Sequence, residues 1–270
     1  MTNTDLFQQG PVEDPFQRRD PDEAAREIES QLHFLGRGII CGTEARGYAT
    51  PQNQSPFRLV VEASEGFIPL WAPNTTLRWR FQERSLIPFM NPEAIKAAIT
   101  ELLAKALLAW GDDVIPVKFA HNEDLWDFEI AVRNADDCTP SGCVLASAFF
   151  PNPGRNELTI YPQMFNQSPK EREDTFKHEL GHVFSLRHFF AQISESRWPV
   201  EIFGTHKRFT IMNYGDPSEL TDEDRSDLKR LYQTAWSGEL TAINNTPIRF
   251  VRPFHALGEI QDRLVSVGRV

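Results

Sequence analysis

Three histidines and a glutamate within residues 178–188, which read HELGHVFSLRH, are the strongest chemical signal in this chain. Residues four apart lie on one face of a helix, so His178 and His182 can bind one metal ion together. Glu179 is next to the first histidine and can act as a general base towards water. Imidazole ligands, a general base and room for water are the parts of a zinc hydrolase.

The residues before this motif predict the helix that must carry it. Ser168 fits an N-cap, Pro169 fits the first helical position, and Glu171 stands three residues after the cap. Apolar residues then recur at helical spacing, at Phe176, Leu180, Val183 and Phe184. We therefore expect the two spaced histidines to share one helical face.

His188 follows too soon after His182 to extend that face. If the helix ends near Phe184, a short turn can fold His188 back towards the metal. Three neutral imidazoles would leave the fourth tetrahedral position to water, which is the open coordination of a catalytic zinc.

A second motif downstream, Thr210-Ile-Met-Asn-Tyr-Gly215, connects the histidines to a known family. Three histidines at this spacing followed by a methionine turn resemble the metzincin clan of zinc endopeptidases. The resemblance implies one catalytic Zn2+ ion bound by the three histidines, with Met212 beneath it. It also implies that Tyr214, as in astacin-like and serralysin-like members, lies near the metal and stabilises the oxyanion.

Two more segments resemble the matrixin branch of this clan. Residues 145–150 resemble its edge strand, and the segment from Leu220 to Tyr232 resembles its final helix, so that the resemblance covers Trp71 to Tyr232. It implies that an extended peptide or protein substrate adds a strand to that edge. The residues expected to contact substrate are Leu145, Ala146, Ser147, Ala148 and Phe149.

Three positions depart from the family pattern. Ser185 stands where the clan usually has glycine, and a non-glycine residue in the left-handed conformation costs about 1–2 kcal/mol. Structural zinc contributes about 10–16 kcal/mol in finger peptides, so such strain need not abolish the site. Ser147 replaces the matrixin histidine for a second zinc, and the acidic calcium segments are missing at 158–162, so we expect one zinc and no calcium. Phe189 matches no subfamily.

Strand and helix patterns alternate along the chain and predict a mixed α/β (α+β) fold. The expected strands are 57–61, 76–81, 116–120, 128–132, 145–150 and 157–161. Long helices are expected from Asn91 to Gly111 and at the zinc motif. The resemblance implies a metzincin-like twisted sheet with two long helices, a zinc cleft and a small C-terminal helical subdomain. We expect an N-terminal extension (1–70), a catalytic domain (71–235) and a C-terminal extension of unknown role (236–270).

The composition of the chain limits the classes of partner that it can bind. The formal net charge of −10 disfavours nucleic acid and anionic membranes, because phosphate binding relies on clustered Lys and Arg. No apolar run approaches the roughly 20 residues that span a bilayer. The first six residues lack the features of a signal peptide, so we expect a cytoplasmic or non-classically secreted protein.

The three cysteines leave several hypotheses open. Cys138 and Cys143 flank a short turn and are equally compatible with a disulfide and with free thiols. Matrixin propeptides hold the enzyme latent through a cysteine on the zinc, and Cys41 is the candidate for that role here. Its neighbours lack the arginine and proline–aspartate of that switch.

Two alternatives to the metzincin-like endopeptidase remain open. One is a thermolysin-like site whose third ligand is a downstream glutamate such as Glu201 or Glu219. The other is a zinc-stabilised binding protein without turnover, in which Ser185 and its flanking segments close the cleft.

Overall fold

The computed structural model describes residues 39–40, 59–63, 66–139, 142–188, 200–203, 210–213 and 218–257. An N-terminal unit, Met1–Gln31, lies entirely outside these ranges. Cys41, Phe189 and Tyr214 also lie outside the described residues, so the expectations for them stay predictions.

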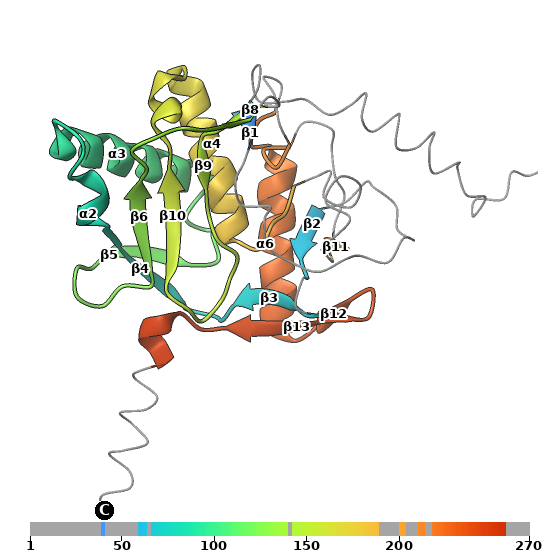
Figure 1. The fold of residues 1–270 in the computed structure, drawn as a ribbon. Helices are drawn as coiled ribbons and strands as arrows, with labels where there is room; N and C mark the ends of the chain where they lie inside the picture. Colours follow the sequence, from blue (N-terminus) through green and yellow to red (C-terminus); the bar gives the residue numbers. More distant parts are fainter. Residues whose placement is uncertain are drawn as a thin grey trace, which may run out of the picture. The chain divides into compact units, whose positions relative to one another are not determined.

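A five-stranded sheet in the order β5-β4-β6-β10-β9 forms the centre of the described chain (Figure 1). Four strands run parallel: β4 (Thr76–Phe81), β5 (Lys118–His121), β6 (Phe128–Val132) and β10 (Asn156–Ile160). The short strand β9 (Ala146–Ser147) pairs antiparallel with β10 and forms one edge. Burial alternates along β4, as its sequence predicts for a strand with one core face.

Two long helices, α3 (Pro92–Trp110) and α4 (Pro169–Val183), pack against each other on one side of this sheet (Figure 1). The Asn91 side chain caps α3 by accepting from the Ala94 N–H at 3.1 Å. Trp110, at the last position of α3, donates its indole N–H to the Lys177 carbonyl of α4 at 3.0 Å. The end of α3 is therefore tied directly to the helix that carries the histidines.

Shorter elements flank this layer. The helix α2 (Glu83–Leu86) follows β4, and the 3-10 helix η2 (Pro162–Asn166) follows β10. A small sheet has the order β1 (Ile39–Ile40), β8 (Gly142–Val144), β7 (Asp137–Thr139). Cys138 and Cys143 are paired across β7 and β8 and form a disulfide. Of the two states that the sequence allows for these cysteines, the structure has the bonded one.

Strands that precede the expected catalytic domain also pair with later parts of the chain. β2 (Leu59–Glu62) pairs with β11 (Val200–Phe203), and β3 (Ile68–Trp71) pairs in parallel with β13 (Thr246–Val251). β12 (Ala242–Ile243) completes the latter sheet. Further along the chain, His255 donates its backbone N–H to the buried Asp127 carboxylate at 2.9 Å.

The final helix, α6 (Asp222–Ser237), begins with a capping box in which Thr221 and Asp224 bond to each other's backbone N–H. Its buried face joins the central sheet, α3 and α4 in one hydrophobic core. The expected mixed α/β fold is confirmed, whereas the domain boundaries at residues 70 and 235 stay predictions. Within the described ranges, no helix is both long and apolar enough to cross a membrane.

Candidate metal centre

The helix α4 has the start that its sequence predicts. The Ser168 hydroxyl accepts from the Glu171 N–H at 3.2 Å, and Pro169 occupies the first helical position. Phe176, Leu180 and Val183 are buried in the core and fix the rotation of the helix about its axis. That rotation places the histidine face of α4 towards the residues that follow the helix.

His178, His182 and His188 converge on one point. One ring nitrogen from each lies within 4.8 Å of the other two, and all three side chains are buried. The Nε2 atoms of His178 and His188 are 2.9 Å apart. The cluster brings together the three residues that the spacing predicts as ligands, including the third, which depends on a turn.

Backbone carbonyls orient two of the rings. His178 Nδ1 donates to the Ile211 carbonyl at 2.7 Å, and His182 Nδ1 donates to the Leu186 carbonyl at 2.7 Å. A neutral imidazole that donates through Nδ1 keeps a lone pair on Nε2. Both rings therefore present an acceptor nitrogen to the centre of the cluster, as metal-binding histidines do when the other nitrogen is hydrogen-bonded.

The protonation state of His182 also suits a ligand. Burial lowers its pKa well below the ordinary value of 6.5, and the charges of His188 and His178 act in the same direction. A neutral ring avoids placing an uncompensated cation in a desolvated site. His182 is therefore neutral near pH 7 and available to a cation.

The turn after α4 explains how His188 reaches the cluster. Ser185 has φ of 76°, in the left-handed region. The Leu186 N–H donates to the Gly181 carbonyl and the Ser185 N–H to the His182 carbonyl, both at 2.9 Å, which makes a Schellman motif. Serine thus adopts the conformation for which the metzincin pattern uses glycine. Among the described residues, its buried Oγ has no hydrogen-bond partner.

Met212 lies against α4 at the level of the motif. A Cβ added to Gly181 would be 3.1 Å from Met212 Cε and would overlap Sδ, so only glycine leaves room for this side chain. The Met212 N–H donates to Thr210 Oγ1 at 3.2 Å, and that hydroxyl donates to Asp224 at 2.6 Å. The methionine turn is therefore tied to the start of α6, while its Ile211 carbonyl accepts from His178.

The other expected site residues differ in burial, and their expected roles stay predictions. Glu179 is buried on α4, and Tyr214 lies outside the described residues. Of the expected substrate contacts, Leu145, Ala146 and Phe149 are buried, whereas Ser147 and Ala148 are partly exposed at the sheet edge. Glu219 is exposed and is not part of the histidine cluster, and the side chain of Glu201 lies outside the description.

Several supporting residues were not predicted. The Ile211 and Leu186 carbonyls are backbone groups, and no side-chain pattern identifies them. Gly181 did leave a signal, because a glycine inside a helical pattern often marks close approach of another group. The ion pair between Arg187 and Glu62 joins residues 125 positions apart, which sequence spacing does not reveal.

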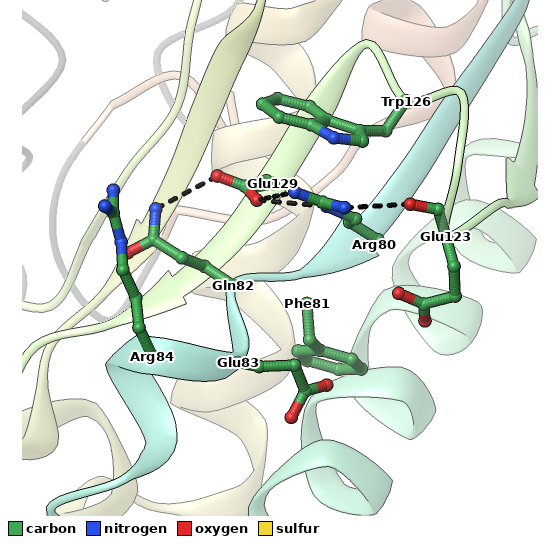
Figure 2. A pocket seen from close by; sticks show the side chains of 8 residues that line it. All are labelled: Arg80, Phe81, Gln82, Glu83, Arg84, Glu123, Trp126 and Glu129. Atoms are coloured by element: carbon green, nitrogen blue, oxygen red, sulfur yellow. Dashed lines mark hydrogen bonds and ion pairs between the residues drawn. The ribbon is translucent and has the colours of Figure 1, made fainter.

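A separate pocket of about 520 Å³ lies beside β4 and α2 (Figure 2). Arg80 donates to Glu129 Oε1 and to the Glu123 carbonyl, and Gln82 donates to Glu129 Oε2. Trp126 packs against the Arg80 guanidinium, 4.7 Å from its ring centroid. The polar groups of this pocket are thus bonded largely to one another.

No protein-family model matches the chain, and no curated protein matches it. Among solved structures, one match is the structure of myroilysin, at 11% identity and a TM-score of 0.41, covering 64% of this chain and 98% of that one. At this level the match carries no argument about function, which rests on the site itself.

Proposed function

We propose that this chain is a zinc-dependent endopeptidase of the metzincin type. The observation that carries the proposal is the convergence of His178, His182 and His188, which are buried, with one ring nitrogen from each within 4.8 Å of the other two. Glu179, also buried, is next to His178 in the chain. Among the described residues, no fourth His, Cys, Asp or Glu joins this group, and three imidazoles with an open fourth position are the donor set of a catalytic zinc site. The identity of the metal and the peptidase reaction are parts of the proposal.

The residues fit such an ion. Two of the three rings are held by carbonyl acceptors on Nδ1, so their Nε2 lone pairs face the centre without further rearrangement. When bound, zinc supplies Lewis-acid polarisation of a carbonyl and lowers the pKa of water to about 7. The protein supplies three buried imidazoles, one of which, His182, has a pKa lowered well below its ordinary value by burial.

Glu179 is the proposed general base. It accepts the proton of the attacking water and passes it to the leaving nitrogen of the scissile peptide. Tyr214 is the proposed donor to the oxyanion, in keeping with its place two residues after Met212. We further propose that the substrate backbone lies along β9 (Ala146–Ser147), the edge strand of the central sheet.

The test is cleavage of a fluorogenic peptide library by the purified full-length chain, with metal content measured on the same sample. We expect cleavage that a zinc chelator abolishes and added zinc restores. Glu179→Gln should keep the metal and lose activity by about 100-fold to 10,000-fold, the usual contribution of a positioned general base.

Glu173→Gln is a matched control on the same helix, because the Glu173 carboxylate binds Lys105 at 2.9 Å and faces away from the histidines. It should retain wild-type activity. Bound metal with no cleavage of any library member would favour the zinc-stabilised binding protein. Full activity of Glu179→Gln would remove Glu179 from the chemistry.

A further inference from the structure

Arg187, the residue before the third histidine, is a buried cation. Its side chain is 1% exposed, and its guanidinium donates to Glu62 Oε2 at 3.0 Å, where the glutamate side chain is 3% exposed. Glu62 is the last residue of β2, far upstream of the zinc motif in the chain. Moving two charges out of water carries a large desolvation cost. The presence of this ion pair in the interior therefore needs an explanation other than solubility.

The same short stretch of β2 also holds the backbone of the turn. The Glu62 N–H donates to the Ser185 carbonyl at 2.9 Å, and Val61 forms an antiparallel bridge with Leu186. Together with the ion pair, β2 therefore contacts three consecutive residues, 185 to 187. These residues make up the whole connection between Phe184, the C-cap of α4, and His188.

Each of the three residues sets the position of a metal ligand. Ser185 holds the left-handed conformation that reverses the chain. The Leu186 carbonyl accepts from His182 Nδ1 and orients that ring. Arg187 is covalently next to His188. A shift of β2 would therefore move two of the three ligand rings.

We propose that Glu62 and Arg187 are positioning residues for the metal, and that β2 acts as a clamp that fixes the turn delivering His188. The inference rests on the proposed metal site. It accounts for how a serine is kept in a left-handed turn where glycine would be free of strain, because β2 holds that turn from outside. It also makes residues 61–62 part of the functional unit, although they precede the expected catalytic domain.

An aromatic contact supports the same geometry. The Arg187 guanidinium carbon lies 5.4 Å from the Phe150 ring centroid, and that ring meets His182 edge-on, with centroids 5.5 Å apart. Arg187 thus lies between the clamp strand and a residue that packs on a ligand. Its position is fixed by the carboxylate on one side and by the ring on the other.

The test measures the zinc dissociation constant of the full-length chain by competition with a chromophoric chelator. Glu62→Gln keeps the size and the backbone pairing of β2 but removes the charge that holds Arg187. We expect zinc to bind 10-fold to 100-fold more weakly, the usual effect of losing an outer partner of a metal ligand. Glu129→Gln is the control, since it breaks the ion pair with Arg80, on residues outside the cluster (Figure 2); it should bind zinc as the wild type does.

If Glu62 has a purely structural role, Glu62→Gln will lower the melting temperature of the metal-free protein and leave the zinc dissociation constant unchanged. That result would overturn the inference. If Glu62→Gln does not fold, the double variant E62Q/R187Q decides, because it removes both charges of this ion pair together. At least a tenfold loss of zinc affinity in the double variant supports the clamp, and affinity within twofold of wild type overturns it. Zinc binding by the wild type without peptide cleavage would contradict the proposed function alone, whereas no zinc binding at all would contradict both.

Discussion

Replacing Gly181 with alanine tests the packing beneath the histidine cluster. The added methyl carbon would lie 3.1 Å from Met212 Cε and closer still to Sδ, whereas non-bonded carbon atoms prefer about 3.5–4.0 Å. Met212 is 2% exposed, so its side chain has no solvent to move into. The methionine must therefore shift into neighbouring core atoms, or α4 must move away from the methionine turn.

Two opposing terms set the size of the effect. Overpacking a well-filled core costs about 1–3 kcal/mol. Alanine in place of a glycine inside a helix stabilises the folded state by about 1 kcal/mol, because alanine has the higher helix propensity. The net change in the free energy of unfolding is therefore a loss of about 0–2 kcal/mol, whereas without the clash the same substitution would gain about 1 kcal/mol.

A double-mutant cycle separates these terms. Urea denaturation of the metal-free forms of wild type, Gly181→Ala, Met212→Ala and the double variant gives the four free energies of unfolding. With the methionine truncated, the alanine methyl group has room, so Gly181→Ala should then be stabilising. We expect a coupling energy of about 1–3 kcal/mol between the two positions.

If the effects of Gly181→Ala and Met212→Ala on the free energy of unfolding were additive, the predicted steric conflict between the two positions would be refuted. Independent sites add within about 0.3–0.5 kcal/mol. If Gly181→Ala stabilises the protein equally with and without Met212, the two residues do not compete for space. The methionine would then have to be displaced from the helix that carries the ligands.

Two further predictions concern the same region. Ser185→Gly should stabilise the metal-free protein by about 1–2 kcal/mol, because glycine adopts a positive φ without strain and the substitution removes a buried, unbonded hydroxyl; destabilisation in urea would show that the turn is not left-handed. Burial raises the pKa of Asp224 above its ordinary value of 3.8, against hydrogen bonds from Thr210 and Thr221. The folded state thus binds the proton more tightly, so wild-type stability relative to Asp224→Asn is greatest below about pH 4 and falls as the pH rises through the folded pKa. A difference constant from pH 4 to 7 in urea denaturation would contradict this.

Local patterns predicted the framework of the site well. Ser168 and Pro169 mark the start of α4, and Asn91 with Pro92 marks the start of α3, because caps are local interactions. Alternation of polar and apolar residues located β4 to the residue. The spacing from His178 to His188 predicted the three residues that converge, since two lie on one helical face and the third follows a single turn.

The features that the sequence did not predict depend on contacts between residues that are distant in the sequence. The pairing of β2 with the turn at Ser185 joins a strand to a loop, and nothing in residues 59–62 specifies that partner. Likewise, β13 pairs with β3 across nearly the whole described chain. The family pattern raised doubt about Ser185 because it considers only the residues of the turn itself. It takes no account of β2, where the Glu62 N–H donates to the Ser185 carbonyl.

X-ray absorption spectroscopy of the zinc-loaded protein tests the proposed open metal site with three histidine ligands most directly. We expect three imidazole nitrogens and one oxygen from water, at about 2.0–2.1 Å from the metal. Truncation of His188 to alanine should remove one imidazole from that shell. A sulfur atom at about 2.3 Å, or a fourth protein ligand in place of water, would contradict an open site with three histidine ligands.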